Sequence, residues 1–245
     1  IIATDTGILI KQIGFDGNLN FGYKPVVFNN NLIIPLSSGV YKIDVKKYQI
    51  SKFCDFQSST TPLVLQNRIV FSSYLDGTIE VYDNNMDKFS SFRTTGRIFI
   101  SPVQYKDNII LFDSNKVVYL IDSNGKLLSK NIVGENPKSE LLIFDNKLYF
   151  ETDKNDFVSY DLLTDKIIKI HKFSDIKEKF DRIKDAPFVI RGDILYKNNG
   201  KLLIYSIYEN KVTFSDFNGE FISASIKFDN KLLSGTNDGK IIFSE

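Results

Sequence analysis

The chain has 245 residues, of which 42% are hydrophobic and 25% are charged, with 31 Lys and Arg residues against 30 Asp and Glu residues. This length and composition predict one globular domain over residues 1–245 that can bury a substantial core. A formal net charge of +1 leaves no basic excess to follow a phosphate backbone, which argues against a nucleic-acid partner.

The residue inventory also argues against most enzymatic chemistry. The chain has one His, His171, and one Cys, Cys54, whereas a structural zinc site usually takes four N or S ligands and a disulfide takes two Cys. His171 lies in the strand-like run 167–172 with no motif around it, so it is not predicted to serve a catalytic triad. Acidic turns such as 122–125 and 153–156 lack the full pattern of a calcium loop. We therefore predict no catalytic, cofactor-binding or metal-binding residue, and a protein that is not an enzyme.

The N-terminal residues predict two short strands, 1–4 and 8–13, separated by a turn at Thr6 and Gly7. The first residue is Ile and the one Met is Met86, so we expect any signal peptide or lipid anchor to lie upstream of residue 1. No apolar run reaches the roughly 18 to 20 residues that a membrane span requires. Contact with a membrane is therefore expected only through a partner or through such an anchor.

From Pro25 onward one sequence pattern recurs: a Pro or small residue, an apolar run, Asn or Asp, a second apolar run, a turn, and a third apolar run that usually contains Tyr. The copies begin near residues 25, 62, 102, 139, 187 and 225. Dividing 245 residues by six gives about 41 residues a copy, which agrees with the period of roughly 40 to 45 residues that is typical of propeller blades.

Each copy is rich in Val, Ile, Phe and Tyr between turn residues, as expected for antiparallel hairpins. The Asp-Gly and Asn-Gly pairs at 76–77, 124–125, 199–200 and 238–239 predict two-residue turns of the primed types. A fourth apolar stretch follows each of the first five copies, at 48–53, 88–92, 126–133, 166–173 and 211–217.

Each repeat is therefore predicted to be a four-stranded meander, and the fold an all-β, six-bladed β-propeller of four-stranded antiparallel blades. The last copy lacks a fourth stretch. We expect the strand at 8–13 to join the last blade and close the ring, because closure removes an open sheet edge.

Several residue types recur at fixed places in the copies: a Pro that opens the repeat, a Tyr in the third run, an Asp that ends a run, and a Thr followed by Lys. They are Pro25, Tyr41, Asp44, Pro62, Tyr82, Asp83, Pro102, Tyr119, Asp122, Tyr160, Asp161, Thr164, Lys166, Pro187 and Tyr205. This pattern resembles the PQQ-like β-propeller repeat, and in particular the BamB-type outer-membrane assembly lipoproteins.

The resemblance implies a periplasmic scaffold, anchored to the outer membrane, that serves envelope or outer-membrane protein assembly and binds an outer-membrane assembly component. Quinone-dependent dehydrogenases share the repeat, and resemblance to them would imply a Trp side chain against the bound quinone and a disulfide beneath it. This chain has no Trp and one Cys, so neither feature can form. No cofactor is therefore expected. The 21 Phe residues are expected to supply the packing between blades that Trp supplies in that family.

The predicted partner-binding residues lie on connections between blades. Residues 174–186 predict a short amphipathic helical insertion with an apolar face of Ile176, Phe180 and Ile183, which either packs onto the propeller rim or shapes a docking surface. Arg and aromatic residues on connections are the types that dominate interface energetics. The candidates are Tyr23, Arg93, Arg97, Phe180 and Arg182.

Three functions stay open at this point. The first is a non-enzymatic protein-interaction scaffold. The second is a carbohydrate- or small-ligand-binding or hydrolytic propeller with carboxylates at its central channel, which a cluster of Asp or Glu residues with raised pKa values would favour. The third is an extracytoplasmic sensor or subunit module of a longer protein.

Overall fold

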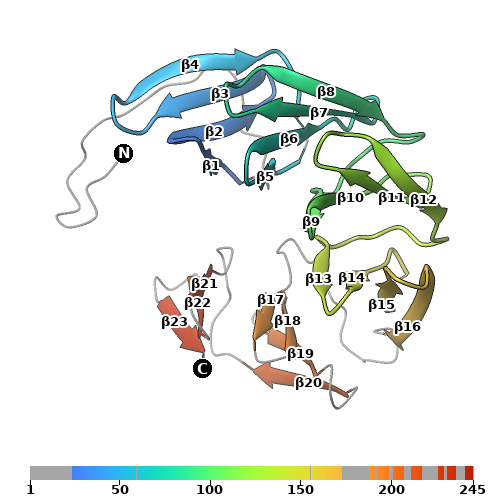
Figure 1. Ribbon diagram of the computed structural model, residues 1–245. Coiled ribbons are helices and arrows are strands. Elements are labelled where there is room, and N and C mark those ends of the chain that lie inside the picture. Colours follow the sequence, from blue (N-terminus) through green and yellow to red (C-terminus); the bar gives the residue numbers. More distant parts are fainter. Residues whose placement is uncertain are drawn as a thin grey trace. The chain divides into compact units, whose positions relative to one another are not determined.

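The computed structural model of the protein (Figure 1) describes residues 24–58, 60–154 and 156–172, and seven further strands between residues 188 and 244. Side chains are described through residue 167 and at Ser206. The chain divides into two compact units, Ile1–Ile132 and Val133–Glu245. The predicted closing strand at 8–13 and the predicted helical insertion at 174–186 lie outside the described residues.

The first unit contains three four-stranded sheets in which consecutive strands pair in chain order, β1-β2-β3-β4, β5-β6-β7-β8 and β9-β10-β11-β12. Every pairing is antiparallel. The strands are β1 (Val26–Phe28), β2 (Asn31–Leu36), β3 (Gly39–Asp44), β4 (Gln49–Cys54), β5 (Leu63–Leu65), β6 (Arg68–Ser72), β7 (Thr78–Asp83), β8 (Lys88–Arg93), β9 (Val103–Tyr105), β10 (Asn108–Phe112), β11 (Val117–Asp122) and β12 (Leu127–Ile132).

The second unit continues the pattern with the sheets β13-β14-β15-β16 and β17-β18-β19-β20 and the three-stranded sheet β21-β22-β23. The all-β fold of four-stranded antiparallel sheets is thus confirmed, whereas the number of blades and the closure of a ring stay predictions. The strands are β13 (Leu142–Phe144), β14 (Lys147–Glu151), β15 (Asp156–Asp161), β16 (Lys166–Lys172), β17 (Phe188–Ile190), β18 (Asp193–Asn198), β19 (Lys201–Ser206), β20 (Lys211–Asp216), β21 (Ile226–Phe228), β22 (Lys231–Gly235) and β23 (Ile241–Ser244).

An Asp ends the third strand of four sheets and fixes the turn that follows it. Oδ1 of Asp44 accepts hydrogen bonds from the main-chain N–H groups two and three residues further on, at 2.8 and 2.9 Å. Asp83, Asp122 and Asp161 accept equivalent main-chain hydrogen bonds. These bonds lower the pKa of Asp44 and of Asp161, because they stabilise the charged carboxylate. The recurring Asp is therefore explained by the turn that it forms.

Two primed two-residue turns lie at positions that the Asp-Gly and Asn-Gly pairs do not predict, and the predicted pairs 199–200 and 238–239 lie outside the described residues. Residues 29–30, an Asn pair between β1 and β2, have φ angles of 51° and 61°, and residues 145–146, Asp and Asn between β13 and β14, have φ angles of 48° and 58°. Two consecutive positive φ angles form a type I′ turn. The prediction of such turns at 76–77 and 124–125 is wrong, because each pair lies in a longer connection and only its Gly has a positive φ.

Successive sheets of the first unit pack face to face. The second and third sheets share a core in which Ile79 and Val81 of β7 and Ile109 and Leu111 of β10 are almost fully buried. Full burial of each such side chain contributes roughly 1.5 to 3 kcal/mol. This packing holds the connections of neighbouring sheets at fixed positions relative to one another.

Aromatic side chains fill the contact between the first and second sheets. The ring centroid of Phe53 lies 5.6 Å from that of Phe71 and 4.9 Å from that of Tyr82, and Phe56 lies 6.3 Å from Phe71. These separations suit favourable tilted aromatic pairs. Packing of Phe between blades is thus confirmed for this pair of sheets.

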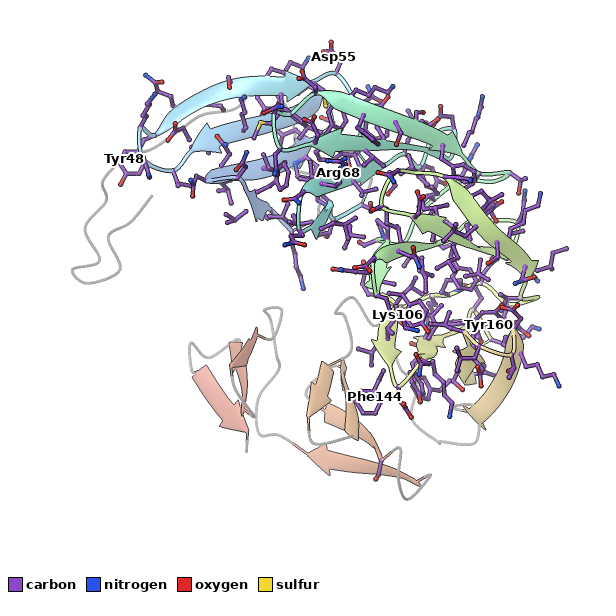
Figure 2. All side chains as sticks on the ribbon, viewed as in Figure 1. Tyr48, Asp55, Arg68, Lys106, Phe144 and Tyr160 are labelled. Carbon is purple, nitrogen blue, oxygen red and sulfur yellow. The ribbon has the colours of Figure 1, made fainter. Side chains whose placement is uncertain are left out.

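The meander brings alternate connections to one edge of each sheet, because the chain reverses direction at every strand. Figure 2 shows Tyr48 and Asp55 at the two ends of β4. Tyr48 lies in a turn within the sheet, and Asp55 lies at the edge from which the chain leaves for the next sheet. We name the part of that second edge formed by the connections 73–77, 94–102 and 113–116 the loop edge.

Candidate interaction surface

Hydrogen bonds join the three connections of the loop edge. Thr94 donates its N–H to the carbonyl of Gly77 at 3.0 Å, and its hydroxyl lies 3.0 Å from that carbonyl and 2.7 Å from the carbonyl of Gly96. Ser114 donates its N–H to the carbonyl of Arg97 at 2.8 Å, and the N–H of Arg97 donates to Oγ of Ser114 at 3.0 Å. The middle connection is therefore fixed to the connection on each side of it.

Gly77 is required where the first two connections meet. Its φ angle is +71°, and a Cβ atom there would clash with the carbonyl oxygen of Gly96 and with Oγ1 of Thr94. Glycine alone combines this backbone conformation with the absence of a side chain. The close approach of the two connections therefore depends on Gly77.

A fully buried carboxylate, Asp113, organises the third connection. Its Oδ2 accepts hydrogen bonds from the hydroxyls of Thr95 and Tyr119, each at 2.8 Å, and its Oδ1 accepts the main-chain N–H groups of residues 115 and 117 at 2.9 and 3.2 Å. Burial raises the pKa of Tyr119, so its hydroxyl stays protonated and donates. A buried carboxylate with four donors is satisfied, which makes Asp113 a structural group.

Five exposed side chains stand on this framework, and we name them the loop surface: Tyr74, Leu75, Arg93, Arg97 and Phe99. Leu75 is 66% exposed, Tyr74 42% and Phe99 37%. The guanidinium carbon of Arg97 lies 5.3 Å from the ring centroid of Tyr74, and Nη1 donates to the Tyr74 hydroxyl at 3.4 Å. Arg97 and Phe99 alternate with two buried Ile residues, so both face solvent.

The loop surface carries two guanidinium groups, those of Arg93 and Arg97. In the part of the chain that the structure describes, neither Arg93 nor Arg97 forms an ion pair, and Nε of Arg93 donates to the main-chain carbonyl of Asp76 at 3.1 Å. The Asp76 carboxylate accepts the hydroxyl and the N–H of Thr78 at 2.7 and 3.1 Å, and these bonds lower its pKa. The positive charge of Arg93 also lowers this pKa, so the Asp76 carboxylate partly offsets the charge of Arg93, whereas Arg97 contacts the Tyr74 ring and hydroxyl.

Two of the five predicted partner-binding residues belong to this surface. Arg93, the last residue of β8, and Arg97 are both exposed there. Tyr23, Phe180 and Arg182 lie outside the described residues, so their assignment stays a prediction.

Three members of the loop surface escape prediction from the sequence. Tyr74 and Leu75 stand among turn residues in the connection 73–77. Two large apolar side chains in a short polar connection are the one feature of the sequence from which an exposed apolar site could be inferred here. Phe99 lies in an alternating run that reads as an ordinary strand. Its exposure depends on which face of that run is buried.

One buried carboxyl of the second unit, Glu151 at the end of β14, has a different environment. Its Oε1 lies 3.3 Å from Nζ of Lys138, and its buried Oε2 has no hydrogen-bond partner among the residues that the structure describes. Burial raises the pKa of Glu151, while the Lys138 ammonium opposes the shift. A single carboxyl beside a Lys does not make the pair of carboxyls that glycoside hydrolysis uses.

Within the described residues, no three His, Cys, Asp or Glu side chains are grouped so that they could hold a metal ion. The same residues include no helix of the length and apolar character that crossing a membrane requires.

Comparison with known proteins identifies the fold. No protein-family model matches the chain, and no curated protein matches it in sequence. Among solved structures, BamB from Moraxella catarrhalis matches with a TM-score of 0.59 and 13% identity over 87% of this chain and 79% of its own. The computationally designed Ika8 protein matches with a TM-score of 0.65 and 16% identity over 89% of this chain and 69% of its own.

At these identities the similarity to BamB shows a β-propeller fold alone. The fold is widespread, because 1028 solved chains match, and propellers host many unrelated functions. The function therefore has to be argued from the side chains of the loop surface.

Proposed function

We propose that this chain is a non-enzymatic protein-interaction scaffold that binds a protein partner through the loop surface. The observation that carries the proposal is the grouping of exposed aromatic, aliphatic and arginine side chains on connections that hydrogen bonds hold in place. Tyr and Arg are enriched among the residues that dominate binding energies. Binding residues often lie on loops that a rigid scaffold positions, and here the packed sheets supply that scaffold.

The hydrogen bonds of the loop edge also bear on affinity. A partner that binds mobile loops must order them, which costs roughly 0.5 to 1.5 kcal/mol for each immobilised side chain. On this edge, Thr94 and Ser114 fix the main chain before binding, and the ring of Tyr74 supports Arg97. More of the interaction energy is then available for affinity.

The setting that we propose is the periplasm, with anchoring to the outer membrane, where the scaffold serves envelope or outer-membrane protein assembly. The support is the resemblance of the repeat to BamB-type lipoproteins together with the BamB-like fold. We also propose a ring of six blades in which residues 8–13 complete the last sheet, of which three strands are described. Deletion of residues 1–14 is expected to lower the melting temperature, and an unchanged melting temperature contradicts ring closure.

The test of the scaffold function is quantitative capture from envelope extract. The wild-type protein is compared with a surface variant, Leu75→Ala with Arg93→Gln and Arg97→Gln. The control is Leu128→Ala with Lys46→Gln and Lys47→Gln, which truncates a similarly exposed Leu and removes the same number of positive charges away from the loop edge.

Because truncation of dominant interface residues costs about 2 kcal/mol or more each, retention of the captured partner by the surface variant is expected to fall more than about tenfold. The control variant is expected to capture as the wild type does, with the melting temperatures of all three proteins similar. Equal capture by the surface variant refutes the proposed surface, and turnover of a sugar or quinone substrate by the purified protein refutes the non-enzymatic assignment.

A further inference from the structure

We infer that the loop surface selects an extended protein segment in which a carboxylate and an apolar side chain lie two residues apart. This inference rests on the scaffold function proposed above. It adds the chemical class of the bound segment and the spacing that the surface recognises.

The carboxylate follows from the state of the two guanidinium groups. A guanidinium carries five N–H donors, of which Arg93 uses Nε toward a main-chain carbonyl and Arg97 uses one Nη toward a Tyr hydroxyl. Neither forms an ion pair among the described residues, although the charge of Arg93 interacts with the Asp76 carboxylate nearby, so Arg97 is the main site for a partner carboxylate. A planar fork of donors fits a carboxylate in bidentate fashion, and the ring of Tyr74 beneath Arg97 limits the orientations of that fork.

The apolar requirement follows from the neighbours of Arg97. Phe99 stands two residues beyond Arg97, both side chains are exposed and Ile98 between them is buried, so the two residues are separated by about 7 Å along the chain at most. Side chains two residues apart on one face of an extended partner have the same separation. A partner carboxylate at Arg97 therefore places the partner's next same-face side chain at Phe99, with Leu75 offering further apolar surface nearby.

Charge and composition favour a protein over other anionic partners. Anionic lipid surfaces and nucleic acids are bound by clusters of cations, each contributing a similar electrostatic increment. Here two guanidinium groups stand among three large side chains with apolar surface, on a chain whose net charge is +1. Such a mixture matches the centre of a protein interface.

The test begins with a displayed library of random peptides about 12 residues long, long enough to span the surface in extended form. The library is selected on the intact protein and counter-selected on the Arg93→Gln and Arg97→Gln double variant. The expected result is enrichment of Asp or Glu with an apolar residue two positions away. Enrichment without acidic residues, or the absence of any peptide that depends on the arginines, overturns the inference.

The strongest peptide is then measured by fluorescence anisotropy beside its Asn and Gln counterpart. The acidic peptide is expected to bind at least about tenfold more tightly to the wild type than its amide counterpart does, and to lose most of that advantage on the double variant. It is expected to bind the Lys46→Gln and Lys47→Gln protein as it binds the wild type. Equal binding of both peptides overturns the inference.

Vesicles that contain phosphatidylglycerol provide the competing outcome. Binding of the wild type to them that is lost in the double variant identifies an anionic lipid surface as the ligand and overturns the inference. The envelope capture separates this inference from the proposed function. For this purpose Leu75→Ala alone and the double variant are tested separately. Partner capture that Leu75→Ala reduces and the double variant retains leaves the scaffold standing and removes the acidic segment. Peptide binding without any surface-dependent partner removes the scaffold.

Discussion

Replacement of Asp113 by Asn tests whether the buried network stabilises the loop edge. The carboxylate accepts the hydroxyls of Thr95 and Tyr119 at 2.8 Å each and two main-chain N–H groups at 2.9 and 3.2 Å. An amide of the same shape keeps one oxygen for the main-chain donors but turns an NH2 group toward the two hydroxyls. Hydrogen bonds to charged groups contribute roughly 1.5 to 3 kcal/mol each. Loss of two, partly offset by reorientation of the hydroxyls, is expected to lower the free energy of unfolding by about 3 kcal/mol.

The assay is urea-induced unfolding followed by circular dichroism. With a urea dependence of roughly 1 to 3 kcal/mol per molar, the expected loss lowers the midpoint by about 1 to 3 M. A double-mutant cycle with Tyr119→Phe is expected to give a coupling free energy of at least about 1 kcal/mol, because the two groups are in direct contact. The control, Asp76→Asn, removes a carboxylate that is exposed on the same edge and is expected to cost less than about 1 kcal/mol. A change below about 0.5 kcal/mol for Asp113→Asn, or strict additivity with Tyr119→Phe, refutes the reasoning.

Three further predictions concern stability. Gly77→Ala is expected to lower the free energy of unfolding by at least about 1 kcal/mol more than Gly134→Ala. Both glycines have positive φ, but a Cβ atom would clash with other atoms only at Gly77. Equal melting temperatures for the two variants contradict this. Phe71→Ala, at a fully buried ring, is expected to cost about 3 to 5 kcal/mol, and a similar loss for the half-exposed Phe89→Ala in the same denaturation assay argues against the aromatic core. Burial raises the pKa of Glu151, so the stability that this group contributes is complete below its unfolded pKa of about 4.3 and is lost as the pH rises through the higher folded value. The free energy of unfolding of Glu151→Gln minus that of the wild type is therefore expected to increase between about pH 4 and about pH 7, and a constant difference contradicts the assignment.

The sheets could be predicted because the strands and turns of each repeat are determined by residues close together in the sequence. The apolar alternation specifies strands, and an Asp at the end of a third strand, such as Asp44 or Asp122, forms a turn within a few residues of itself. The role of Gly77 could not be predicted from its neighbours in the sequence. Its sequence context suggests a primed turn, whereas the structure uses its missing side chain for the approach of Thr94 and Gly96.

The candidate site could be predicted only in part for a related reason. Arg93 and Arg97 are recognisable as arginines on a connection, which is a property of residue type. The exposure of Phe99 is a property of packing, because it depends on which face of the connection its neighbours cover. That face is set by the burial of Ile98 in the core that the second and third sheets share, which no local pattern encodes.

The central claim is that a protein partner contacts the loop surface, and site-specific photocrosslinking in cells tests it most directly. A photoreactive amino acid is placed at position 75, in the middle of the surface, and at position 47, an exposed residue in the turn between β3 and β4. The expected result is one discrete crosslinked protein from position 75, lost when Arg93→Gln and Arg97→Gln are added, with no such product from position 47. Crosslinking to the same protein from position 47 alone, or from both positions equally, would contradict the assignment of the loop surface.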